Sequence, residues 1–176
     1  MKLPVFVSVG SRLTPSQQEV YKFFENSLSR IFNLDPRTVG QSDKATRPPL
    51  VEIVALAKHC SGGLILGFEE YTIEKGRRYS KSAKSSKDLY DNEDMSTERW
   101  STPWNQLEAG ICKGLDLPLM IFSEGVKGGI FDLGSSDLFV QTMPQSSDLI
   151  DEAEKASILH TLASWQGAVE RHYYYK

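Results

Sequence analysis

The feature that most constrains the fold is an uninterrupted apolar run, Leu64-Ile65-Leu66-Gly67-Phe68, which follows directly on Gly62-Gly63. The run has the length of a β-strand and contains no polar residue, so neither of its faces is suited to contact with water. A strand that is apolar on both faces is typical of a parallel sheet covered by helices on its two sides. The middle of this chain therefore predicts an α/β protein.

The segments around this run alternate between strand and helix patterns. We expect strands at Val5–Val9, Arg37–Gly40, Leu64–Phe68, Pro118–Phe122 and Leu138–Val140. We expect helices that begin at Pro15 after an N-cap at Thr14, at Pro48-Pro49, at about Pro103 and at about Leu149. Strands that alternate with helices over short crossovers give a three-layer, flavodoxin-like or Rossmann-like fold, with five mostly parallel strands in the order 2-1-3-4-5 and helices on both faces.

Length and composition are consistent with one domain over residues 1–176. A net charge of −3 argues against general affinity for nucleic acid, although a local basic patch remains compatible with it. The two cysteines, Cys60 and Cys112, form no CxxC pair and fit buried thiols in a reducing cytoplasm. No signal peptide pattern precedes the first strand, and no apolar run approaches the roughly 20 residues of a membrane span. We therefore expect a cytoplasmic protein with neither membrane nor nucleic acid as partner.

The segment 69–101 interrupts the alternation of strands and helices. It is rich in charged residues of both signs and has few apolar residues to anchor it. A loop of this length in a compact domain is usually functional or disordered. Two interpretations stay open: a lid over a binding site, or a solvated surface insertion. A long final helix, at about 149–175, ends in a run of three tyrosines that packs on the domain, packs on a second chain or forms a flexible tail.

In open parallel sheets, ligands bind at the carboxyl ends of the strands, where the strand order reverses. This rule places a site among the loops that begin at Gly10, Glu69 and Glu124. The turn Gly10-Ser11-Arg12 can offer backbone amides and a guanidinium to a phosphate, but its residue types also suit an ordinary turn. The loop Gly125–Gly134 contains four glycines and either folds over a ligand or forms a simple turn.

Glu108 is the strongest candidate for a chemical role. It is spaced four residues from Trp104 and three from Ile111, so it shares a helix face with apolar side chains. A carboxylate in that position destabilises the fold unless it is neutral, paired or used. It can act as a nucleophile on an anomeric carbon or stabilise an oxocarbenium-like transition state. The alternative is a structural acid that pairs with an arginine or caps a backbone amide.

The segment Trp104–Gly110, followed by Gly114–Ile121, resembles the nucleoside 2-deoxyribosyltransferase family and the related TIR-like nucleotide hydrolases. In that family a glutamate on this helix acts in cleavage of an N-glycosidic bond, and the resemblance puts Glu108 in that role. The opening strand and turn, Val7–Ser11, is similar to the family's first strand and substrate loop. One departure follows the third strand, where Gly67–Tyr71 stands in place of the family's Asp-Gly turn and second aspartate. Glu69 or Glu70 would have to replace that acid.

The resemblance implies an enzyme that cleaves, or transfers across, the N-glycosidic bond of a nucleoside, a nucleotide or an NAD-like dinucleotide. It needs no cofactor and no metal, because the nucleotide is itself substrate or ligand. Glu108 is the expected catalytic carboxylate, and the other expected site residues are Ser8, Gly10, Ser11 and Arg12 for ribose or phosphate, Phe68 and Trp104 for the base, and Glu69 for the sugar. The alternative function is a TIR-like or Rossmann-like module that binds a nucleotide without turnover, in signalling or interaction. A homo-oligomer is expected by analogy with the family.

Overall fold

The central element of the fold is a five-stranded sheet. The computed structural model describes residues 1–44, 46–75, 97–132 and 140–175. The sheet consists of β1 (Leu3–Val9), β2 (Leu34–Arg37), β3 (Gly63–Gly67), β6 (Leu119–Ser123) and β7 (Val140–Thr142). Its order is β2-β1-β3-β6-β7, and every neighbouring pair is parallel. This is the predicted order. The apolar run that follows Gly62 forms the central strand β3, and all residues of this strand are buried.

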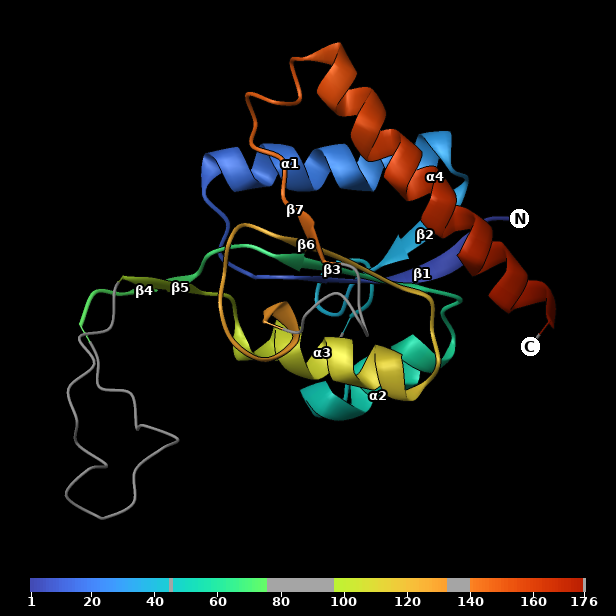
Figure 1. Cartoon of the computed structure of the whole chain (residues 1–176). Coiled ribbons are helices and arrows are strands. Elements are labelled where there is room, and N and C mark those ends of the chain that lie inside the picture. Colours follow the sequence, from blue (N-terminus) through green and yellow to red (C-terminus); the bar gives the residue numbers. More distant parts are fainter. Residues whose placement is uncertain (45, 76–96, 133–139, 176) are drawn as a thin grey trace, which may run out of the picture.

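Helices cover both faces of the sheet, which gives the predicted three-layer Rossmann-like fold. Helices α1 (Pro15–Asn26) and α4 (Glu152–Tyr175) lie on one face, and α2 (Pro49–Lys58) and α3 (Pro103–Gly114) on the other (Figure 1). A π-helical turn, Ser27–Ile31, continues α1, and a 3-10 turn, Gly129–Phe131, follows β6. No helix among the described residues is long and apolar enough to cross a membrane.

Side chains of β1 and β3 alternate between two apolar layers, as expected for strands covered on both faces. Val5, Val7, Leu64 and Leu66 join the layer under α1 and α4, where Phe24, Leu162 and Trp165 are also buried. Phe6 faces the other side and packs with residues of α2 and α3, among them Ile53, Ala57 and Cys112. Ile65 packs there with Ala109 and Ile121. The sheet is therefore held between two cores, and α3 is anchored directly on its central strands.

Several predicted element boundaries are wrong. The second strand is Leu34–Arg37 and not Arg37–Gly40; it lies at the edge of the sheet, where Pro36 is tolerated because its missing N–H faces away from the ladder. Residues 38–43 instead form a turn in which Gly40 has a φ of +82°. The last strand runs from Val140 to Thr142, while residues 138 and 139 of the predicted strand lie outside the described residues.

The start of the final helix was misplaced by a few residues, whereas α2 begins at Pro49, as predicted, with Pro48 as its N-cap. The final helix begins at Glu152 and not at Leu149, so Ile150 precedes it and is exposed. Leu50 and Val51 lie in the first turn of α2 and are exposed. At its far end α4 continues to Tyr175; Tyr173 lies at a small cavity beside Phe32, while Tyr175 is exposed.

The ends of the polar insertion are ordered. They form an antiparallel ribbon of β4 (Tyr71–Ile73) and β5 (Glu98–Trp100), which projects from the sheet at the carboxyl ends of the central strands (Figure 1). Residues 76–96 lie outside the described residues, so neither the lid nor the surface insertion that we predicted there is tested. The ribbon nevertheless places Glu69, Glu70 and Tyr71 at the edge of the sheet where a ligand is expected.

Candidate functional site

The first turn of α3 is built by Thr102 and Asn105. Thr102 is the N-cap, and its Oγ1 accepts a hydrogen bond from the backbone N–H of Asn105 at 3.1 Å. The same hydroxyl lies 3.1 Å from Asn105 Oδ1, to which it donates. Pro103 occupies the first position of the helix, where its missing N–H leaves no bond unmade. These contacts fix the orientation of the Asn105 side chain, which is buried.

A chain of side-chain hydrogen bonds leads from Asn105 to Glu108. Asn105 Nδ2 donates to Ser8 Oγ at 2.7 Å, and Ser8 Oγ donates in turn to Glu108 Oε2. Ser8 is buried in β1, while Glu108 is half-buried. Hydrogen bonds in series polarise one another, so the donation from Asn105 strengthens the one from Ser8 to the carboxylate. Strand β1 and helix α3 thus meet in a polar contact that holds Glu108 in one place.

The electrostatic surroundings of Glu108 favour its neutral form. Burial raises the pKa of Glu108 to about 7, and the hydrogen bond from Ser8 opposes this effect only in part. Within the described residues no lysine or arginine pairs with Glu108, and no backbone amide donates to it. The alternative of a structural acid neutralised by an arginine is therefore not what this part of the chain shows. At neutral pH the group exists in both protonation states, as a general acid–base role requires.

Glu108 lines a cavity of about 590 Å³, which lies in the size range of small-molecule sites. The cavity brings together five of the predicted site residues: Gly10, Ser11, Arg12, Trp104 and Glu108. Ser8, a sixth, lies behind Glu108 as its hydrogen-bond donor. The remaining lining comes from β1, the loop after β2, α2, β4 and the start of α3, through Val9, Val39, Pro49, Ile53, Glu70, Tyr71, Thr102 and Pro103.

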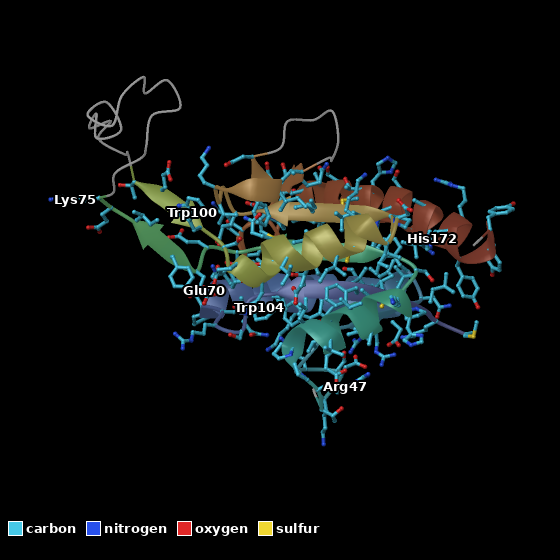
Figure 2. The ribbon with its side chains drawn as sticks, turned by 90° about the horizontal axis from the view of Figure 1, so that it is seen from below. Arg47, Glu70, Lys75, Trp100, Trp104 and His172 are labelled. Atoms are coloured by element: carbon cyan, nitrogen blue, oxygen red, sulfur yellow. The ribbon has the colours of Figure 1, made fainter. Side chains whose placement is uncertain are left out.

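Glu70 is a second carboxylate at the same cavity. Figure 2 shows it on the same side of the molecule as Trp104, near the base of the ribbon. Its Oε2 atom is buried and has no hydrogen-bond partner among the described residues, and a Cβ placed on Gly10 would lie 3.4 Å from it. A buried carboxylate oxygen without a donor is unfavourable, so a ligand that brings a donor to this position would gain free energy. Of the two acids that we considered after β3, Glu70 is the one at the cavity.

Two predicted site residues lie elsewhere. Phe68 is buried under α1 and lines a separate cavity of about 430 Å³ with Gln17 and Met143, so it does not form a wall opposite Trp104. Glu69 pairs with Arg99 of the ribbon at 3.3 Å and accepts a hydrogen bond from Thr72. Phe68 and Glu69 lie outside the cavity because the chain after β3 directs their side chains away from it and directs Glu70 toward it.

Sequence reasoning missed Tyr71 and Asn105. Tyr71 lies in the insertion, where we predicted no element, and it supplies an aromatic wall to the cavity in the place assigned to Phe68. Asn105 lies three residues before Glu108 and therefore on the same side of α3. A buried polar residue at that spacing was a usable signal, since it needs a partner that only a neighbouring element can supply.

The described part of the glycine-rich loop forms a turn that packs on α3. Gln106 Nε2 donates to the carbonyl of Gly128 at 2.8 Å, and the N–H of Ile130 donates to Gln106 Oε1 at 2.9 Å. Gly128 has a φ of +94°, and a Cβ on Gly129 would lie 2.1 Å from Gln106 Oε1, so neither position accommodates a side chain. The loop does not line the Glu108 cavity in its described part, and residues 133 and 134 lie outside it.

The described residues contain no group of three or more histidine, cysteine, aspartate or glutamate side chains that could hold a metal ion. No family model matches this chain, and neither a curated protein nor a solved structure matches it.

Proposed function

We propose that this protein cleaves, or transfers a group across, the N-glycosidic bond of a nucleoside, a nucleotide or an NAD-like dinucleotide, with Glu108 as the catalytic carboxylate. One observation carries the proposal: the Glu108 carboxyl is held at a ligand-sized cavity by Ser8, without a cation from the described residues to neutralise it. The resemblance of Trp104–Gly110 to the nucleoside 2-deoxyribosyltransferases and TIR-like hydrolases supports the same reaction. The nucleotide is substrate, and no other cofactor is required.

Cleavage of an N-glycosidic bond develops positive charge on the anomeric carbon as the base departs. A carboxylate beside that carbon stabilises the charge or attacks it to form a glycosyl–enzyme intermediate. Both roles gain strength in a water-poor site, because the attraction between opposite charges grows as the effective dielectric constant falls. The half-buried position of Glu108 supplies that setting, and the hydrogen bond from Ser8 keeps one oxygen engaged while the other is free to face the sugar.

The other cavity residues have complementary chemistry. Trp104 and Tyr71 offer aromatic surfaces against which a purine, pyrimidine or nicotinamide ring can stack. Gly10, Ser11 and Arg12 suit a phosphate or a sugar hydroxyl through backbone amides and a guanidinium. Glu70 suits a sugar hydroxyl, which would donate to its unpaired oxygen.

The test is release of free base from NAD, from ribonucleosides and from 2-deoxyribonucleosides, followed by chromatography. We expect at least one of these substrates to be cleaved. Glu108→Gln and Glu108→Ala should lower the rate by at least about a hundredfold, as loss of a principal electrostatic group does in other enzymes. Glu19→Gln, an exposed acid of α1 outside the cavity, is the matched control. A folded Glu108→Gln protein with full activity would refute the assignment.

A second function is favoured by a specific property of the same residue. Because its pKa is about 7, Glu108 is partly protonated at neutral pH, and a neutral carboxyl binds by hydrogen bonding and does not attack carbon. The cavity would then bind a nucleotide signal without turnover and report it to a partner or to a second copy of the chain. A nucleotide that raises the melting temperature and is recovered intact would favour this function over catalysis.

Two further expectations accompany either function. We propose a reducing compartment, the cytoplasm, because Cys60 and Cys112 are both free and buried. We also propose that the ligand is a small molecule and not a nucleic acid or a membrane.

A further inference from the structure

Another cavity, of about 400 Å³, lies on the α2 side of the sheet and away from Glu108. It is bounded by the start of β1, the end of β2, the turn that follows β2, the segment that leads into α2 and the last two turns of α2. Figure 2 shows Arg47 in the segment that leads into α2, apart from Glu70 and Trp104. Val39 lines both cavities, so the two share one wall.

The two carboxylates of this cavity are already engaged. Asp43 accepts two hydrogen bonds from the Arg37 guanidinium and one from Ser42, and the arginine lowers the pKa of Asp43. Glu52 Oε1 accepts hydrogen bonds from the backbone N–H of Thr46 at 3.0 Å and of Arg47 at 2.8 Å. These bonds keep both carboxylates ionised and orient them toward their partners, and the ion pairs with Arg37 and Arg47 offset their negative charges.

Apart from Arg37, which is paired with Asp43, the cationic and donor groups of the cavity are engaged much less. Within the described residues, Lys44 and His59 make no side-chain hydrogen bond or ion pair, although both line the cavity. Arg47 uses only part of its guanidinium for Glu52, at 3.3 Å and 3.5 Å. The Cys60 thiol adds no negative charge, because burial raises its pKa to about 12. The free hydrogen-bonding capacity of this cavity is therefore that of donors, in a chain with a net charge of −3.

We propose that this cavity is a second ligand site, which binds a small phosphate-bearing molecule. The phosphate oxygens accept from the Lys44 ammonium, from His59 and from the free N–H groups of Arg47, all of which suit a phosphate. Val39, Ala55 and Leu56 form an apolar wall for the remainder of the molecule. This inference does not depend on the proposed function, because no residue of the Glu108 reaction takes part in it.

The site is tested by NMR titration of the ¹⁵N-labelled protein with inorganic phosphate and with adenosine monophosphate, at constant ionic strength set with potassium chloride. We expect the backbone amides of Lys44 and His59 to shift with saturation, and adenosine monophosphate to bind more tightly because it also covers the apolar wall. Val39 is unsuitable as a reporter, since it would respond to a ligand in either cavity. Gly10 and Ser11 report the Glu108 cavity separately, so failure of one site leaves the other measurable.

Lys44→Glu should weaken phosphate binding by at least about tenfold, the factor expected when a charge-assisted contact becomes a repulsion. Lys58→Glu is the matched control: it makes the same charge change in the last turn of α2, on an exposed side chain that does not line the cavity, and should change the affinity by less than about twofold. Equal affinity of the wild-type and Lys44→Glu proteins would overturn the proposal. So would phosphate-dependent shifts confined to Gly10 and Ser11, or no saturable shift at all.

Discussion

Replacement of Glu108 by glutamine should make the protein more stable at alkaline pH. In the folded protein burial raises the pKa of this carboxyl from 4.5 to about 7. An acid whose pKa is higher in the folded state binds its proton more tightly there than in the unfolded chain. Folding is therefore progressively disfavoured as the pH rises from about 4.5 to about 7, and the full penalty is present above that window. Glutamine is neutral throughout and carries no such penalty.

The size of the effect follows from the shift of the pKa. A shift of about 2.5 pH units corresponds to about 3 kcal/mol at 1.36 kcal/mol per unit. This is an upper bound, because the carboxyl is half-buried at an open cavity and water reduces the penalty. The amide oxygen of glutamine can still accept from Ser8, so the variant leaves no buried hydroxyl unpaired. For a chain of this length, each kcal/mol corresponds to roughly 2 to 4 °C in melting temperature.

The measurement is the free energy of unfolding in urea, for the wild type and for Glu108→Gln, at pH 5, 6, 7 and 8. We expect the variant to gain stability relative to the wild type by about 1 to 3 kcal/mol between pH 5 and pH 8. The exposed Glu19→Gln variant should differ from the wild type by no more than about 0.5 kcal/mol at any of these values. A difference between wild type and Glu108→Gln that does not change with pH would refute the electrostatic argument.

Two further predictions concern the supports of the site. Asn105→Ala should destabilise the protein by about 1 to 3 kcal/mol. It should also raise the pKa of Glu108 above its wild-type value, because Ser8 then donates more weakly to the carboxylate. A carboxyl-carbon NMR titration measures this pKa, and an unchanged or lowered value would contradict the prediction. Gly67→Ala should lower the free energy of unfolding in urea by about 1 to 3 kcal/mol, because its Cβ would lie 2.3 Å from the Phe131 ring. The Cβ of Gly110→Ala meets no atom within 4 Å, so this variant should be neutral or stabilising. Equal losses of stability at both positions would rule out the steric explanation.

The sheet order was predictable because its signals are local. Few alternatives to a parallel sheet of this order fit three local features: the apolar run at β3, the helices with proline at their first position, and the short crossovers. The second strand was misplaced because Leu34–Arg37 contains Pro36, which argues against a strand anywhere except at an edge. Nothing in the local pattern reveals which strand lies at an edge; that depends on the assembled sheet.

The residues of the candidate site were predicted in part, for the same reason. Glu108, Trp104 and the turn after β1 lie together because their positions follow from strand ends and helix periodicity. The directions of Phe68, Glu69 and Glu70 do not follow in this way, since they belong to a segment that is neither strand nor helix. Their placement depends on the ribbon, whose pairing joins Tyr71 to Trp100 across an insertion that shows no periodicity.

The pairing of β4 with β5 fixes Tyr71 at the cavity, whatever the length of the segment that joins the two strands. Ile73 and Glu98 are paired, so the two ends of the intervening segment lie side by side. Tyr71 precedes that segment, and its pairing with Trp100 fixes its position. For a flexible connector, halving the length changes the free energy of loop closure by only about 0.6 kcal/mol. If the stretch between the two strands is exchanged for a shorter connector, we expect the wall that faces Glu108 to be kept, because Tyr71 is held by its pairing with Trp100.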